Sequence, residues 1–579
     1  MLLQNLIRCG GKPRSIQMVK RILNILNREY AGLHKAAYLL GAFAFLSQLL
    51  ALVRDRLLAH YFGAGVALDV YYAAFRVPDL IYFSIASLVS VTVLIPFLAE
   101  KIKISDSDHD RNAHRFINSV FTVFSLAIFF VSFVVFVFSS NIADVAVPGF
   151  SIEQKKDFVT LMRILLLSPI LLGLSSLLGS IVQVYRKFFV YASAPILYNL
   201  GIILGIVFLM PFWGIVGVAW GVIIGAFFHV LIQIPVVYKH GVLPVFTAKI
   251  HFAEIKKVIM LSLPRTIALS INQITLIVLI ALASFMMEGS VAVFNFSMSL
   301  QSVPLSVIGM SYSIAAFPTL ARLFVGNKKE EFIQELAIAA RHIIFWATPI
   351  IVLFIVLRAQ IVRSILGSGA FDWSDTRLVA AGLGVFSISI VAQSLQLLLT
   401  RAYYAAGETK IPVLVNVFSA IVIVVLAALF IYIYEANILI KNFFEILLRI
   451  EDVPGSAIVM LSLAYSIGII LNCGLLLLLF RRKFFASQLG ILQVFMQIFP
   501  ASVIMGFVSY QFLAVFAEMF NLNSFWGVFA QGLFSGIIGI FVGVLVLVLL
   551  GNNEIKEIFA STHNKARRKE VVAPDIEEL

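Results

Sequence analysis

Long apolar runs alternate with short polar breaks along almost the whole chain. Each run has about 20 residues or more, the length that an α-helix needs to cross roughly 30 Å of hydrocarbon. The pattern therefore predicts about fourteen transmembrane helices. They lie near residues 36–60, 70–99, 116–139, 158–185, 189–210, 213–238, 257–287, 289–320, 335–357, 379–401, 411–434, 456–480, 489–515 and 525–550.

Composition supports a membrane protein. Of the 579 residues 61% are hydrophobic and only 13% are charged, a balance that a water-soluble fold of this size would not tolerate. We therefore expect an all-α integral membrane protein. Cys9 and Cys473 indicate neither a disulfide framework nor a metal cluster. The net charge of +13 is scattered among short loops, which membrane topology explains better than nucleic-acid binding.

Loop charges predict the orientation, because Lys and Arg concentrate on the cytoplasmic side of a membrane. Basic residues occupy alternate connections, including those with Lys101, Arg186, Lys256, Lys328, Lys410 and Arg481. Both termini are then cytoplasmic. Residues 1–35 form a basic leader, in which an amphipathic stretch from Ser15 to Tyr30 is expected to rest on the inner leaflet or to bind a partner. Residues 551–579 form a solvated tail.

A second amphipathic stretch runs from Glu435 to Asp452, with Leu439, Phe443 and Leu448 among charged residues. It is predicted to be a helix at the external interface, and a role in gating is the alternative.

The chain also contains an internal repeat. Pro195-Ile-Leu-Tyr-Asn199 and Pro412-Val-Leu-Val-Asn416 share a pattern, and two further matches recur in the same order. Six helices separate equivalent points, so the repeats have the same orientation. Such repeats place a substrate cavity between two bundles that rock to expose it to alternate sides. The predicted parts are an N-terminal six-helix lobe at 36–240, a C-terminal six-helix lobe at 250–483 and two additional helices at 489–550.

Charged residues near the first two helices are candidates for function. Arg54, Asp55, Asp69 and Arg76 lie within or beside apolar runs, where an ionised side chain costs about 2.5–3.5 kcal/mol at mid-helix. Arginine offers a planar fork of donors to phosphate or carboxylate. The alternative is structural: an ion pair of Arg54 with Asp55 or Asp69 that locks the hairpin. Both interpretations can hold together.

Other polar positions carry less weight. Arg163 and Arg265 lie within about two turns of predicted helix starts and are interpreted as interfacial arginines more readily than as substrate contacts.

No Walker loop, HExxH motif or Ser-His-Asp constellation occurs in a polar domain. Neither an enzyme, nor a cofactor, nor a metal site is predicted. Secondary transport or facilitated flipping is the remaining class of activity.

Several motifs resemble the MurJ (MviN) lipid II flippases. They begin with Arg54-Asp-Arg-Leu-Leu-Ala-His-Tyr-Phe-Gly-Ala-Gly and Asp69-Val-Tyr-Tyr-Ala-Ala-Phe-Arg-Val-Pro-Asp, and later include Thr400-Arg-Ala-Tyr-Tyr-Ala-Ala-Gly-Glu-Thr-Lys. The resemblance covers most of residues 36–550. It implies a fold of the multidrug/oligosaccharidyl-lipid/polysaccharide exporter superfamily: two pseudo-symmetric six-helix lobes plus two C-terminal helices. It also implies a cationic cavity for an undecaprenyl-pyrophosphate-linked peptidoglycan precursor.

The resemblance also nominates site residues. Arg54 and Asp69 match cavity positions of the family, and Arg401 matches its basic residue after the tenth helix. Where the family commonly has further arginines, this chain has Gln48 and Tyr82, and the segment Asn295 to Pro304 has no cation. Pyrophosphate binding would then rest on Arg54, Arg76 and Arg265.

The leading hypothesis is therefore a monomeric lipid II flippase of the bacterial inner membrane that serves cell-wall synthesis. Its partners would be the anionic lipid-linked substrate and membrane lipids, with no nucleic acid. An exporter of another polyprenyl-linked oligosaccharide, a drug/cation antiporter of the same fold and a non-transporting scaffold are the alternatives.

Overall fold

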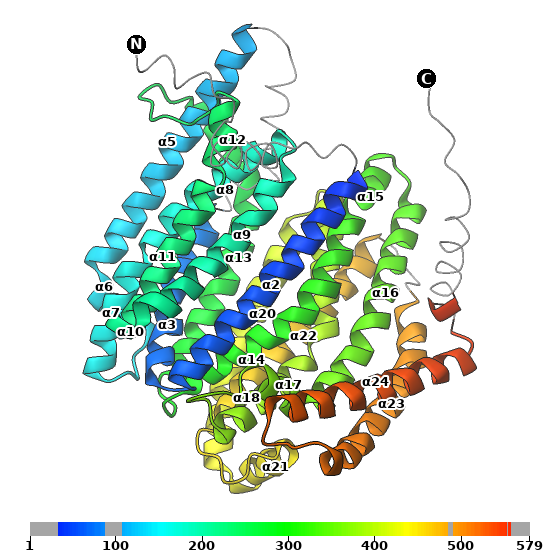
Figure 1. Ribbon diagram of the computed structural model, residues 1–579. Coiled ribbons are helices and arrows are strands. Elements are labelled where there is room, and N and C mark those ends of the chain that lie inside the picture. The colour runs from blue at the N-terminus through cyan, green and yellow to red at the C-terminus, as the bar shows by residue number, and fades with distance from the viewer. Residues whose placement is uncertain (1–32, 87–106, 485–489, 553, 557–579) are drawn as a thin grey trace, which may run out of the picture. The chain divides into compact units, whose positions relative to one another are not determined.

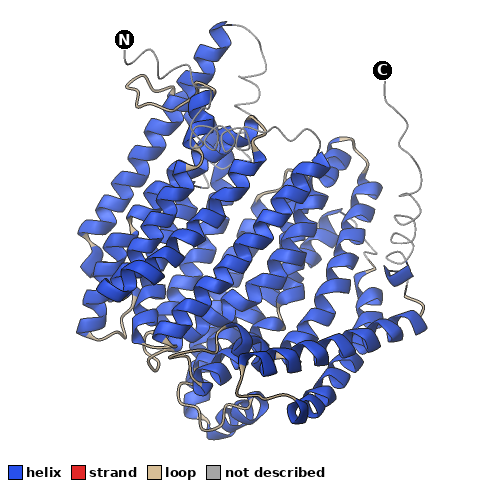
Figure 2. Cartoon of the chain, in the orientation of Figure 1, coloured by secondary structure: helices blue, strands red, loops and turns tan. Residues whose placement is uncertain are grey.

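The computed structural model describes residues 33–86, 107–484, 490–552 and 554–556. Within these ranges the regular structure is helical, without strands (Figure 1, Figure 2). The helices of the first half are α2 (Leu33–Phe62), α3 (Val66–Ala86), α5 (Ser107–Val137), α6 (Ser139–Ala146), α7 (Ile152–Leu165), α8 (Leu167–Val184), α9 (Phe188–Leu204), α10 (Met210–Trp213), α11 (Ile215–Leu231), α12 (Ile234–Lys239) and α13 (Phe252–Ala283). Those of the second half are α14 (Ser290–Pro304), α15 (Ser311–Val325), α16 (Lys329–Val356), α17 (Arg358–Ile365), α18 (Trp373–Ser387), α19 (Ile390–Ala405), α20 (Lys410–Ala436), α21 (Ile438–Leu448), α22 (Ile458–Phe484), α23 (Ile491–Met519) and α24 (Phe525–Leu549).

The predicted class, an all-α membrane protein, is confirmed. Among the described residues, eleven helical stretches are long and apolar enough to cross a membrane, or twelve if α18 and α19 form one bent span. The remaining two predicted spans coincide with α2 and α3. The predicted continuation of α3 to residue 99 lies outside the described residues.

Some spans are less regular than their apolar runs suggest. α18 and α19 meet at a bend of 47°. Near the break the hydroxyl groups of Ser387 and Ser389 donate to the carbonyls of Leu383 and Phe386, a competition with the backbone that often bends helices. π-helical segments interrupt two other spans at Gly205–Leu209 and Leu305–Met310.

The chain divides into two compact units. Unit 1 comprises Met1–Leu57 and Val70–Ile277, and unit 2 comprises Leu58–Asp69 and Val278–Leu579. The turn that joins α2 to α3 thus belongs to unit 2, whereas the bodies of both helices belong to unit 1. The lobe limits expected near residues 240 and 250 stay a prediction. The leader, apart from residues 33–35, and most of the tail from 551 lie outside the described residues.

The stretch predicted to be an external amphipathic helix contains α21. The Asn437 side chain caps it by accepting hydrogen bonds from the backbone N–H groups of Leu439 and Ile440. Leu439 and Phe443 are exposed and Leu448 is buried, as expected for a helix at an interface. Its external location stays a prediction.

Glycines bring α9 and the π-helical segment that follows it into backbone contact with α11 inside unit 1. A Cβ atom at Gly201 would lie 2.2 Å from Gly225 Cα, and one at Gly205 would lie 2.3 Å from Gly221 Cα. Small residues allow such close approach, and in a bilayer helix association depends on this packing because lipid tails are as apolar as leucine. The glycines therefore fix the spacing of these two helices.

We predict that Gly201→Ala lowers the thermal unfolding midpoint of the detergent-solubilised protein, because the added methyl group collides with backbone. Gly474→Ala on α22 is the matched control, since a Cβ there would meet nothing within 4 Å. It should leave the midpoint unchanged or raise it, because Ala is the better helix former by about 1 kcal/mol. Equal behaviour of the two variants would contradict the packing argument.

Candidate functional site

Polar side chains of unit 1 gather around Arg54 in α2. Its guanidinium donates two hydrogen bonds to Asp55 Oδ1, from Nε at 2.9 Å and from Nη2 at 2.7 Å. Nη1 donates a third to Asn199 Oδ1 on α9 at 3.2 Å. Of the two ion pairs considered from the sequence, the structure therefore forms the one with Asp55.

Asn199 is held in place by its own amide group. Nδ2 donates to Ser47 Oγ at 3.2 Å and to the Pro195 carbonyl at 3.1 Å, so the amide oxygen is directed to Arg54. Asn199 was not among the predicted site residues. The sequence feature that could have identified it is an amide at the end of a repeated Pro-x-x-x-Asn pattern in an apolar helix.

Arg76 belongs to the same polar cluster. It is buried on α3, and the charges of Arg54, Asp55 and Arg76 all act on the Tyr72 hydroxyl one turn earlier. The charge of Arg76 also acts on Asp79, one turn further along. Unit 1 thus contains two of the predicted arginines, and Asp55 forms a described ion pair with the first of them, Arg54, which lowers the cost of its charge in the membrane.

Arg54 retains capacity to bind an anion. A guanidinium has five N–H donors, and three of them donate to described residues. The side chain is 24% exposed, whereas that of Asp55 is 3% exposed. The two other N–H groups suit the oxygens of a phosphate or carboxylate.

Asp69 has a different environment, in unit 2. Its two carboxylate oxygens accept hydrogen bonds from the backbone N–H groups of Gly289 at 2.6 Å and Ala292 at 2.7 Å. These groups lie at the start of α14, where unpaired N–H groups and the helix dipole favour a negative charge. Asp69 therefore caps α14.

The turn around Asp69 is fixed by further contacts within unit 2. The Ala370 N–H donates to the His60 carbonyl at 2.8 Å, and the Ala64 N–H donates to Asp375 Oδ2 at 3.0 Å. Gly289 has a φ of +90°, and a Cβ there would lie 2.0 Å from the Ala64 carbonyl oxygen. Residues 58–69 are thus fastened by backbone and carboxylate groups rather than by arginine.

The other two predicted site residues lie on α13 and α19. Arg265 is in the part of α13 that belongs to unit 1, but its side chain is outside the described part of the structure. Arg401 lies near the end of α19 in unit 2 and is half-buried. Tyr82, at a position where the resemblance led us to expect arginine, forms a hydrogen bond with Ser176 at 3.2 Å.

Comparison with known proteins identifies the family. The family model described as "Lipid II flippase MurJ" matches residues 58–531. The chain belongs to the MurJ family. MurJ proteins are transporters rather than enzymes, and this membership with the apolar spans makes the chain a multi-pass protein of the bacterial inner membrane.

Individual MurJ relatives agree with this assignment. The lipid II flippase MurJ of Burkholderia cenocepacia is 25% identical over 483 residues, which cover 82% of this chain and 89% of that protein. The probable lipid II flippase MurJ of Buchnera aphidicola from Schizaphis graminum is 29% identical over 66% of this chain and 75% of its own length.

Solved structures show the same fold. A lipid II flippase MurJ in an inward closed conformation matches with a TM-score of 0.69 at 23% identity, over 90% of this chain and all of that one. An inward-facing MATE family multidrug resistance transporter of the MOP superfamily matches with a TM-score of 0.60 at 15% identity, over 76% and 95% of the two chains. The predicted exporter fold is therefore confirmed.

We predict that Asp69→Ala destabilises the protein, because two N–H groups of α14 lose their acceptor. Loss of a helix cap costs about 1–2 kcal/mol, so the thermal unfolding midpoint in detergent should fall by a few degrees. Glu331→Ala removes one exposed acid of unit 2 and should change the midpoint much less. An unchanged midpoint in Asp69→Ala with impaired transport would instead favour a direct substrate role.

Proposed function

We propose that this protein is a lipid II flippase, moving the undecaprenyl-pyrophosphate-linked peptidoglycan precursor from the inner to the outer leaflet. The match of the MurJ family model to residues 58–531 carries the proposal. The relatives do not favour the alternatives, an oligosaccharide exporter of other cargo or a drug/cation antiporter.

Arg54 and Arg76 are the residues that we assign to the pyrophosphate. Asp55 and Asn199 orient the Arg54 guanidinium and leave two of its N–H groups without a described partner, so binding would not require them to be released first. Charge-assisted hydrogen bonds to phosphate are strong where water is scarce. Arg265 and Arg401 stay predicted contributors, and Asp69 would act through the turn that it fastens.

Translocation would follow alternating access, in which two bundles rock about a central substrate. The parallel repeat in the sequence supports this mode. Membrane potential, an ion gradient or consumption of the substrate on the outer side would drive translocation in one direction. We propose that the protein functions as a monomer.

Replacement of Arg54 tests the site. In cells depleted of their own lipid II flippase, the wild-type chain should restore growth. Arg54→Gln should fail, because the guanidinium is lost while Asp55 stays buried. Arg322→Gln, at an exposed arginine on α15, is the matched control and should complement.

Protein levels and detergent stability separate a binding defect from misfolding. Arg54→Lys keeps the charge but lacks the planar fork of donors. It should fold normally and restore growth only partly. Full growth with Arg54→Gln at normal expression would refute the assigned role. Failure of the well-inserted wild-type chain would refute the proposed cargo.

The loop charges predict that both termini face the cytoplasm. A fluorescent protein fused after Leu579 should therefore fluoresce, and alkaline phosphatase fused there should be inactive. The opposite pattern should appear for fusions in the connection at 516–523, which carries no basic residue. Active phosphatase at the C-terminus would overturn the orientation.

A further inference from the structure

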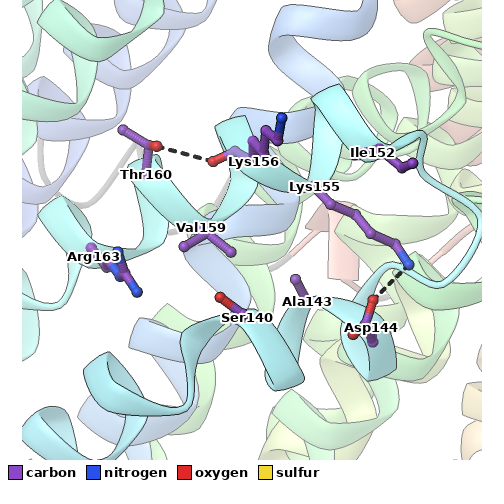
Figure 3. Close-up of a pocket in the computed structure, with 9 residues that line it drawn as sticks. All are labelled: Ser140, Ala143, Asp144, Ile152, Lys155, Lys156, Val159, Thr160 and Arg163. Carbon is purple, nitrogen blue, oxygen red and sulfur yellow. Dashed lines mark hydrogen bonds and ion pairs between the residues drawn. The ribbon is translucent and has the colours of Figure 1, made fainter.

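A cavity of about 460 Å³, open to the surface, lies between α6 and α7 (Figure 3), and none of its lining residues belongs to the cluster around Arg54. The two short helices form a hairpin. Val147 and Phe150 of its turn are buried, and Ser151 caps α7 through a reciprocal hydrogen-bond pair with Gln154. Buried apolar groups and a capping box make this a defined turn, so the facing sides of the helices are held in place.

One face of α7 supplies most of the cavity wall. Positions 152, 155, 156, 159, 160 and 163 line it, and this spacing of three and four residues follows one side of a helix. The face carries Lys155, Lys156 and Arg163. The acids Glu153 and Asp157 of the same helix do not line the cavity. Asp144, from α6, is its one acidic lining residue among those described, which leaves a net charge of +2 from three cations and one acid.

The basic groups differ in how many of their donors already have a partner. Lys155 Nζ pairs with Asp144 Oδ1 at 2.8 Å. Arg163 donates from Nε to Ser139 Oγ at 2.8 Å and lies 5.0 Å over the Phe136 ring. Its terminal Nη groups and the Lys156 ammonium make no hydrogen bond to a described residue. The guanidinium is therefore positioned, while its terminal Nη groups are available to an anion.

The length of this span is greater than the hydrocarbon core requires. α7 and α8 together form a stretch of 33 residues, Ile152–Val184, or about 50 Å of helix at 1.5 Å per residue. The hydrocarbon core is only about 30 Å thick, so part of the stretch extends beyond it. Since α7 carries charged residues and α8 is apolar, α7 and the cavity beside it are expected at the depth of the headgroups. Around the cavity, Phe136, Phe138, Val145 and Ile152 are exposed, as expected beside lipid rather than water.

We propose that the cavity binds the phosphate group of an anionic phospholipid headgroup. Arg163 and Lys156 bind the phosphate oxygens, Ser140 is positioned to donate a hydrogen bond, and the exposed apolar side chains contact the acyl chains. Asp144 limits the affinity because it opposes the anion and holds Lys155. This site is distinct from the Arg54 cluster and does not depend on the transported cargo.

Native mass spectrometry of the full chain in detergent tests the proposal. The probes are phosphatidylglycerol, phosphatidylcholine with the same acyl chains, and millimolar inorganic phosphate as a competitor. Wild type should retain phosphatidylglycerol in preference to phosphatidylcholine, and phosphate should not displace it. The double variant Lys156→Gln/Arg163→Gln should weaken the binding of phosphatidylglycerol by about tenfold, because each basic residue near an anionic headgroup strengthens its binding.

The control is Lys239→Gln/Lys249→Gln, which removes the same charge from two exposed lysines of unit 1 and should bind like wild type. Asp144→Asn should retain phosphatidylglycerol more tightly, a gain that a merely structural effect would not produce. Equal retention by both double variants, no gain in Asp144→Asn, or equal retention of phosphatidylcholine would overturn the proposal. Displacement by inorganic phosphate would overturn the lipid source and favour a soluble anion.

Discussion

An ionised side chain inside a bilayer requires a partner, and the polar interior of unit 1 is arranged around that requirement. Arg54 is paired with Asp55 and with an amide from α9, and Arg76 lies within electrostatic range of Asp79. Because Asp55 is built in as a partner, Arg54 can stay ionised before any substrate arrives. The same arrangement leaves donors on Arg54 without a described acceptor. The side chains that stabilise the Arg54 charge are therefore the same group to which we assign the proposed anion binding.

The two repeated Pro-x-x-x-Asn motifs use asparagine in comparable ways. In unit 1 the Asn199 oxygen accepts from Arg54. In unit 2 the Asn416 oxygen accepts from Asn472 Nδ2 on α22 at 2.9 Å. Each motif thus links its own helix to a neighbour by a polar contact within the apolar region, but only the first includes a charge. If the two halves arose by duplication, the two asparagines have come to contact different groups.

The sequence predicted the spans well, because a run of about 20 apolar residues has few alternatives. It predicted the local pair of Arg54 and Asp55 as one of two options. It could not find Asn199, which lies 145 positions from Arg54, nor the partner of Asp69, because backbone N–H groups leave no side-chain signal. Arg163 was expected near a helix start, yet it lies in the last turn of α7. The apolar run from 158 to 185 conceals the break at Leu166 between α7 and α8.

The glycine contacts between α9 and α11 have a mechanical consequence. Two helices whose backbones touch at successive turns cannot slide or roll past one another without steric collision. We therefore expect α9 and α11 to move as one rigid pair, which includes Asn199 on α9. A transport cycle that deforms unit 1 would then change the packing at other helix boundaries. Asn199, the partner of Arg54, would move together with both helices.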